Sequence, residues 1–398
     1  MTRTDSVRGR LALMVAHCAG MIDLVALPVW VGTLVARYGL QPQQAGLLAT
    51  LFLAGAVVAS LVVAPRFDRL PGRLVASAGF GVAAAAFATV ALLDLPYAGM
   101  AVLHAVAGLA TGAALSVTHG TIARSGRPHR LFALVGMALG VFAILFLGAT
   151  PALVAATAER LGGAMLFIEF AGVMAVGAVF AAWAFPSPDL AAQGVARGPA
   201  LRAPLSGAVW AGMVGLGAMG LTQAMTFSFL ERVGDHRGFG LAAVTGVLIA
   251  LGVVNLFPAA LAAVLERRLP TRAVLVAGPL LQSALCAVIM TSTEFLPYAA
   301  AASVFAAVMI FTHTFAFGAL ARLDPTGRAL AATPAMLMVG AALGPIVGGT
   351  LVQTQGYASL GAAAVLIGLV AVGCFLQVRP ERAAPAASTG APHAQPHG

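Results

Sequence analysis

Residues 74–93 read LVASAGFGVAAAAFATVALL, an uncharged stretch bounded by Arg73 and Asp94. An α-helix rises about 1.5 Å per residue, so a helix of this length spans about 30 Å, the thickness of the hydrocarbon core of a bilayer. The stretch therefore predicts a transmembrane helix.

Comparable stretches recur on both sides of this one. The uncharged stretches are 38–65, 74–93, 95–123, 131–158, 203–230, 238–265, 273–293 and 295–321. Two further apolar spans each contain one acidic residue: Asp23 in 11–36 and Glu169 in 161–185. The uncharged run 329–378 is twice the length of a span, and the polar turn at 353–356 divides it. The sequence thus predicts an all-α membrane protein with twelve transmembrane helices.

The composition excludes several other classes of protein. Of the 398 residues, 60% are apolar and 9% charged, against about 25% charged in a soluble domain. A soluble enzyme, a disordered protein and a disulfide-rich secreted domain do not fit these values. The three cysteines lie in apolar spans without metal-ligand spacing. No H-E-x-x-H, P-loop or G-x-S-x-G motif is present, so we expect no catalytic residues, metal or cofactor.

The arginines predict the orientation in the membrane. The net charge is +9 and all 22 basic residues are Arg. With a cytoplasmic N-terminus, only four arginines fall in outer loops: Arg37, Arg160, Arg232 and Arg237. This positive-inside bias predicts that both termini are cytoplasmic. It also explains the basic charge without a nucleic-acid partner. The absence of Lys is typical of a GC-rich bacterial genome, which points to a bacterial inner membrane.

The longest loop between spans divides the chain into two halves. We expect a cytoplasmic N-terminus (1–10), a six-helix half (11–185), a cytoplasmic linker (186–206), a second six-helix half (207–378) and a disordered tail (379–398). The linker contains four prolines together with Gly, Asp and Arg, and the tail is rich in Ala, Pro, His and Gly; Pro and Gly in both segments favour irregular structure.

The two halves repeat each other in sequence. The segments 69–73 and 268–272 share R-L-P-x-R, and 135–140 and 339–344 share V-G-x-A-L-G. A third pair, 120–124 and 318–322, begins with Gly and ends with Ala-Arg. The matches keep their order at similar offsets, which indicates two parallel, pseudo-symmetric halves. In such folds the substrate site lies near the membrane midplane between the halves.

These features resemble the major facilitator superfamily over nearly the whole chain. The loop between the family's second and third helices carries roughly G-x-L-x-D-R-x-G-R, which Asp68-Arg69 and Gly72-Arg73 match with one extra residue between them. The resemblance implies that Asp68, Arg69 and Arg73 contribute to an inner gate. The alternative is that these charges only fix the topology.

A glycine-rich pattern in the eleventh helix predicts close helix packing. It comprises Gly340, Gly344, Pro345 and Gly348; small residues four apart let helices approach, and a proline can bend a helix. The pattern resembles one that marks the fifth helix of the family's drug:proton antiporters. The fifth helix here keeps only Gly136 and Gly140, followed by Val141.

A few polar residues inside the spans are candidates for function. An ionisable group at mid-bilayer costs at least about 2.5 kcal/mol on insertion scales, and Asp23 lies halfway along the first span. Asp23 is therefore the leading candidate for proton coupling or for binding a charged substrate. The alternative is a structural Asp bonded to a neighbouring helix. The further candidates are Glu169, His17, Gln223 and Asn255.

Together these features favour a secondary transporter that works by alternating access. We expect proton-coupled efflux of a small organic molecule by a monomer, as in the exporters of the resembled family. A proton-coupled importer of a metabolite is the first alternative. A non-transporting receptor or assembly factor is the second. The expected partners are a small-molecule substrate, protons and the lipid bilayer.

Overall fold

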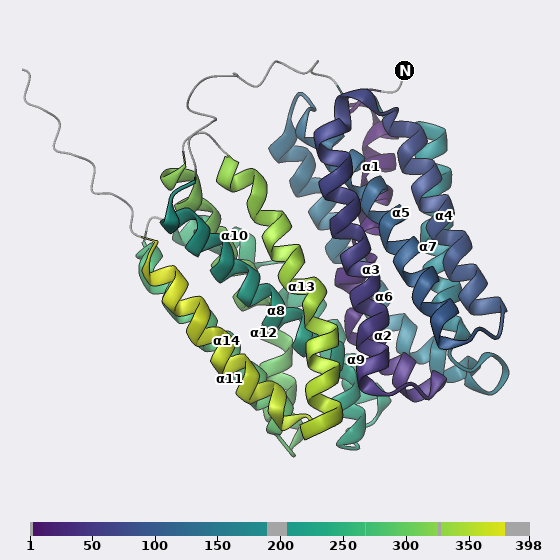
Figure 1. Ribbon diagram of the computed structural model, residues 1–398, viewed down its shortest axis with the longest axis vertical. Coiled ribbons are helices and arrows are strands. Elements are labelled where there is room, and N and C mark those ends of the chain that lie inside the picture. Colours follow the sequence, from purple (N-terminus) through teal and green to yellow (C-terminus); the bar gives the residue numbers. More distant parts are fainter. Residues whose placement is uncertain (1–2, 189–204, 267, 325–327, 379–398) are drawn as a thin grey trace, which may run out of the picture.

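The computed structural model describes residues 3–188, 205–266, 268–324 and 328–378 (Figure 1). Within these residues, twelve stretches are helical, long and apolar enough to cross a membrane. This confirms the all-helical architecture and the twelve spans. The expected tail lies outside the described residues, as does most of the expected linker.

The end of the bundle where α1 begins is called the proximal end, and the opposite end is called the distal end.

The first half contains the first six spans. The elements are α1 (Val7–Gly20), α2 (Ile22–Tyr38), α3 (Pro42–Val63), the 3-10 helix η1 (Ala64–Arg69), α4 (Gly72–Leu92), α5 (Tyr97–Ala123), α6 (Pro128–Leu161) and α7 (Ala164–Ala184).

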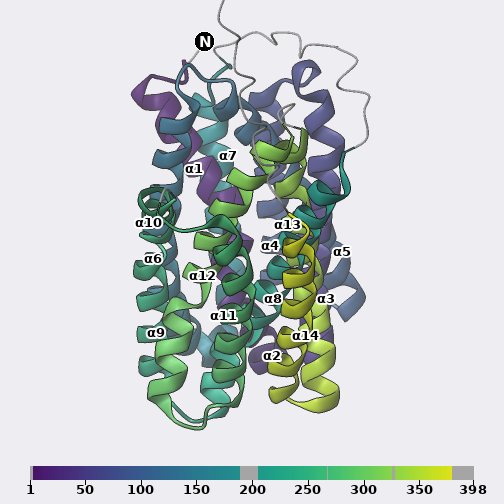
Figure 2. The same cartoon turned by 90° about the vertical axis from the view of Figure 1, so that its left-hand side faces the viewer.

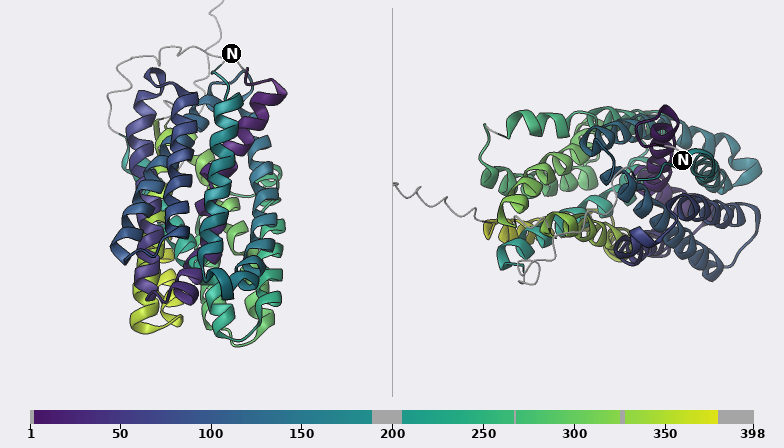
Figure 3. Two further views of the ribbon diagram at one scale, coloured as in Figure 1. Left: turned by 90° about the vertical axis from the view of Figure 1, so that its right-hand side faces the viewer. Right: turned by 90° about the horizontal axis from the view of Figure 1, so that it is seen from above.

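The second half repeats this arrangement and lies beside the first, as the view from above in Figure 3 shows. Its elements are α8 (Gly207–His236), α9 (Leu241–Val254), α10 (Pro258–Leu265), α11 (Thr271–Thr291), α12 (Phe295–Leu323), α13 (Arg328–Gln355) and α14 (Ala358–Leu376).

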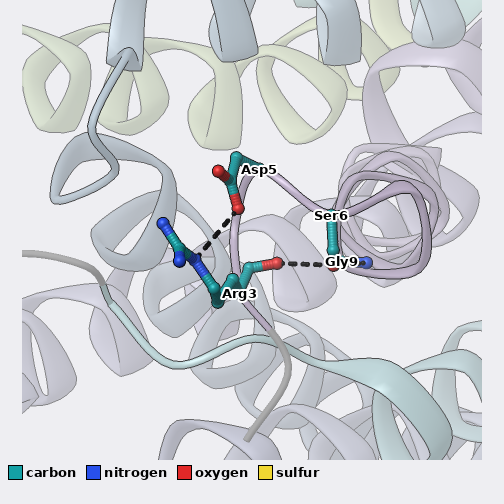
Figure 4. A network of polar contacts seen from close by, with 4 residues as sticks. All are labelled: Arg3, Asp5, Ser6 and Gly9. Carbon is teal, nitrogen blue, oxygen red and sulfur yellow. Dashed lines mark hydrogen bonds and ion pairs between the residues drawn. The ribbon is translucent and has the colours of Figure 1, made fainter.

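A local network fixes the start of α1 (Figure 4). Ser6 is the N-cap: its Oγ accepts from the Gly9 N–H at 3.0 Å and donates to the Arg3 carbonyl at 2.7 Å. Arg3 Nε also lies 3.3 Å from Asp5 Oδ1. The bond from Gly9 satisfies one of the backbone N–H groups that a helix start leaves unpaired, and the other two contacts hold the preceding residues in place.

Two of the expected spans are broken within the membrane. The first span divides at Met21 into α1 and α2, so that Asp23 lies in the first turn of α2 rather than in the middle of a continuous helix. The eighth divides after Asn255 into α9 and α10, because Pro258 has no N–H to continue the helix of α9. Figure 2 shows α10 stacked above α9 on one side of the bundle.

The sequence repeat corresponds to a repeated contact at the proximal end. In the first half, the Arg124 guanidinium lies 4.5 Å from the ring centre of Phe67. In the second half, Arg322 Nη1 lies 3.9 Å from Glu266 Oε1. Both arginines end a repeated Gly…Ala-Arg segment, and both contacted residues precede the R-L-P segment by the same spacing. The halves are therefore pseudo-symmetric in their contacts as well as in helix order.

Among the described residues, the main contacts between the two halves are made by α2 with α8, α3 with α13, and α6 with α9. The α3–α13 contact lies in the distal part of both helices, where the Gln43 N–H donates to Gln353 Oε1 at 3.2 Å and the Ile346 N–H donates to Thr50 Oγ1 at 3.1 Å. These contacts close the distal end of the bundle.

Candidate functional site

A cavity of about 330 Å³ lies between the halves near the middle of the bundle. Its walls come from α2, α3 and α6 of the first half and from α8, α9, α12 and α13 of the second. Most of the wall is apolar, with residues such as Phe227 and Met309. The volume is at the lower end of the range for pockets that bind small organic molecules.

Four polar side chains line this cavity among the described residues: Asp23, Gln223, Asn255 and His313. Asp23 comes from the first half and the other three from the second. A bound molecule would thus contact both halves at once. Three of the four, Asp23, Gln223 and Asn255, are residues that the sequence nominated.

Asp23 owes its position to the break between α1 and α2. Gly20 disfavours helix continuation and packs closely against Leu115, and the chain turns at Met21 before α2 begins. The backbone N–H groups of Asp23 and Leu24 face the Asp23 carboxylate. The N-terminus of α2 therefore offsets part of the cost of burying a negative charge at this point.

Pro28 exposes a further acceptor beside Asp23. It lies inside α2, and a proline cannot donate to the carbonyl four residues earlier. The Leu24 carbonyl therefore lacks its helical donor, and Leu24 lines the cavity. This carbonyl is therefore a candidate acceptor for a hydrogen bond from a bound molecule.

The facing wall offers neutral polar groups. Asn255 caps the C-terminus of α9 at the helix break, and its Oδ1 is buried without a hydrogen-bond partner. His313 Nδ1 on α12 is also buried; the Met309 carbonyl faces it, but the two make no hydrogen bond of good geometry. Gln223 Oε1 accepts from Gln282 Nε2 at 3.1 Å, which holds the Gln223 amide in place. A ligand that hydrogen-bonds to Asn255 and His313 would satisfy atoms that otherwise carry a desolvation cost.

The structure places Glu169 and His17 away from the cavity wall. Thr150 Oγ1 donates to Glu169 Oε2 at 2.6 Å, across the packed helices α6 and α7. His17 Nδ1 lies 3.0 Å from His119 Nε2, joining α1 to α5. Both residues thus link helices within the first half.

The expected gate residues lie at the proximal end. Arg69 ends η1 and is exposed, and the Arg73 guanidinium donates to the carbonyls of Ala182 and Trp183 at the end of α7. The side chain of Asp68 lies outside the described residues. In this structure Arg73 contacts its own half.

The small residues of the eleventh helix (α13) pack closely. Gly340 meets the backbone of Gly217, and Gly344 and Gly348 meet Met225, so that α13 lies directly against α8. Of the matching residues in the fifth helix (α6), Gly140 contacts Leu256 of the second half, whereas no atom surrounds the position of a Gly136 Cβ within 4 Å. Gly136 and Gly140 both line the cavity.

Two notable residues are not among the candidates named from the sequence above. His313 lines the cavity, but a single histidine in an apolar span gave no pattern to single it out. Glu231 directly follows the uncharged stretch 203–230, so it looked like the start of an outer loop. Instead α8 continues to His236 and places Glu231 against α2 of the other half. Extending the predicted helix by two turns beyond the uncharged stretch would have included Glu231.

Comparisons with known proteins agree with this architecture. A sequence model described as Major Facilitator Superfamily matches residues 12–325. No curated protein sequence matches the chain. Among solved structures, a bacterial homologue of the human lysosomal transporter Spinster, in an inward-facing and occupied conformation, has a TM-score of 0.71 at 13% identity and covers 93% of both chains. A mutant of the nucleoside transporter NupG has a TM-score of 0.70 at 13% identity, over 93% of this chain and 98% of its own.

Proposed function

The chain belongs to the Major Facilitator Superfamily and is a secondary transporter rather than an enzyme, and we propose that it exports a small organic molecule in exchange for protons. The family and the fold carry the transporter assignment. The cavity residues support the proposed coupling and the substrate class. The resemblance of the sequence to the family's exporters supports the proposed direction of transport.

The proposal of proton coupling rests on the position of Asp23 in the cavity wall. This residue is the one acidic side chain among the described residues that line the cavity. A carboxylate in an apolar cavity needs a positive partner or a proton, because a lone charge there is costly. A proton and a substrate that compete for this single carboxylate would be exchanged across the membrane.

The ionisable side chains that line the cavity also support a neutral or singly positive substrate. No basic side chain apart from the histidine His313 lines the cavity in the described part of the chain, so a multiply negative molecule would lack partners. Hydrogen-bond donors on the substrate would meet Asp23, Asn255 Oδ1 and the Leu24 carbonyl. Apolar parts would pack on residues such as Phe227 and Leu251.

Alternating access would expose this cavity to one side at a time. The distal end is closed by the α3–α13 contact. If the Arg-rich proximal end is cytoplasmic, as the arginine distribution supports, the structure is an inward-facing state in a bacterial inner membrane. Asp68, Arg69 and Arg73 would then join the proximal ends of the halves in the opposite state.

The test uses purified protein in liposomes that contain a pH dye and, in turn, each member of a panel of neutral and singly positive compounds. Outward movement of a compound should be accompanied by inward movement of protons, and Asp23→Asn should abolish the proton movement. Glu169→Gln is the matched control, because that carboxyl group lies outside the cavity wall. Protons that move in the same direction as the compound would establish symport instead. Proton exchange that persists in Asp23→Asn would overturn the role of Asp23.

A further inference from the structure

The helices α2 and α8 form the second contact of the distal closure. Gly32 of α2 lies so close to Glu231 of α8 that a Cβ built on Gly32 would overlap the Glu231 carboxyl group. The same Cβ would lie 3.8 Å from Arg232 Cβ. The absence of a side chain at Gly32 therefore makes room for a carboxyl group from the opposite half.

The charged neighbours of Glu231 do not pair with it. Arg232 forms an ion pair with Asp235 on the same helix, one turn away. Arg37, on α2, interacts with Glu231 only through its charge, without an ion pair, and its side chain is exposed to solvent. In the described part of the chain, no hydrogen bond and no ion pair within 4.0 Å involves the Glu231 carboxyl group.

The remaining ionisable groups around this contact in the described part of the chain are Tyr298, Tyr357 and His236, whose ring centre lies 5.2 Å from that of Tyr357. The Tyr298 hydroxyl of α12 faces Glu231 but donates to the Leu230 carbonyl at 2.8 Å. Tyr357, in the turn between α13 and α14, faces Arg232 and Asp235, and burial raises the pKa of its hydroxyl, so that it stays neutral. Neither tyrosine supplies a positive charge to Glu231.

We propose that Glu231 is a proton-dependent latch of the distal gate, which closes when its carboxyl group is protonated and seated against Gly32. A charged carboxylate without a partner would be costly between two packed helices, whereas a neutral carboxyl group fits there. When the halves separate at this end, water reaches Glu231 and the carboxylate is solvated. The proton comes from the distal solution on closing and returns to it on opening.

This latch is distinct from the coupling role proposed for Asp23. Gly32 lies nine residues beyond Asp23 on α2, which is about 13.5 Å along a helix. The latch rests on the proposed function only in requiring that the halves alternate. Its test therefore measures the conformation of the distal end without substrate or transport.

The distance between spin labels at Gln43→Cys and Gln353→Cys reports this conformation. Both residues are exposed and belong to the neighbouring α3–α13 contact, not to the latch itself. Measurements in nanodiscs from about pH 5 to about pH 9 in an Asp23→Asn background isolate Glu231. The closed-to-open ratio should fall with rising pH, by at most about tenfold per pH unit, the limit for one proton.

Two variants give opposite expectations. Glu231→Gln should keep the short distance between the spin labels, which marks the closed distal end, at every pH, because the amide is neutral. Gly32→Ala should shift the population towards the long label distance, because the methyl group takes the space of the Glu231 carboxyl group, which can no longer seat there. Glu169→Gln, the matched control, should keep the pH dependence. A ratio that does not change with pH, or a pH dependence that survives in Glu231→Gln, would overturn the proposal, whatever the transport assay shows.

Discussion

The backbone of Gly46 on α3 lies directly against the Pro345 carbonyl on α13, and a Cβ built on Gly46 would overlap that oxygen. Gly349 makes a similar approach to the Pro42 carbonyl one turn nearer the distal end. Backbone-to-backbone contact of this kind needs small residues. Here it joins the two halves, so the glycines define how tightly the distal end closes.

We predict that Gly46→Val opens the distal end without unfolding the protein. The valine cannot fit while α3 touches α13, but the halves can move apart there. The distance between labels at Gln43→Cys and Gln353→Cys should increase, and the thermal unfolding temperature should change little.

Gly108→Val is the control for this prediction. Gly108 of α5 lies as close to the Phe52 carbonyl of α3, but both helices belong to the first half. No rigid movement of the halves relieves that overlap, so this variant should lower the unfolding temperature markedly. Equal destabilisation by the two substitutions would show that the α3–α13 contact is part of the folded core and not a gate.

The number of spans could be predicted from the sequence, because a helix needs about 20 apolar residues to cross the hydrocarbon core of a bilayer. The breaks within the first and eighth spans were harder to predict. Pro258 marks one of them, but the turn at Met21 depends on Gly20 packing against Leu115, a contact between α1 and α5. This turn decides where Asp23 lies, so the sequence nominated the residue without fixing its environment.

The positions of the other polar residues show the same limit. Glu169 and His17 are rare polar groups in apolar spans, as Asp23 is, and composition alone cannot separate them from it. Their partners, Thr150 and His119, lie on other helices. Only the packing of the helices distinguishes a polar group that faces a cavity from one that pairs with a neighbour.

We predict that Asn255→Leu weakens substrate binding without destabilising the protein. Its Oδ1 is buried and unpartnered in this structure, so removing the amide costs no existing hydrogen bond from that atom. The loss of one hydrogen bond to a bound substrate should raise the KM for transport about three- to tenfold. Ser303→Ala, on α12 away from the cavity wall, should leave KM unchanged. An unchanged KM in Asn255→Leu would remove Asn255 from the binding site.

We predict that the Thr150–Glu169 bond stabilises the first half. Thr150→Val leaves Glu169 without the donor to Oε2, while Oε1 already lacks a partner. The free energy of unfolding should fall by about 1–3 kcal/mol. Glu169→Gln keeps an acceptor for Thr150 and should cost less. Chemical unfolding in mixed micelles measures both. Loss of proton exchange in Glu169→Gln would instead give Glu169 a direct part in coupling.

We predict that the His17–His119 pair is a structural link between α1 and α5. The two ring nitrogens lie 3.0 Å apart in a largely buried position, and the His119 ring also packs edge-on against Phe132 with centres 5.8 Å apart. Replacing one histidine by Leu leaves the other ring nitrogen without a partner, so each single variant should lose about 1–3 kcal/mol of unfolding free energy. The double variant His17→Leu with His119→Leu removes both polar groups and should cost clearly less than the sum of the two. Proton exchange in liposomes should persist in the double variant, because neither ring lines the cavity. Additive losses of stability together with a loss of proton exchange would mean that His17 acts in coupling through a path other than the cavity.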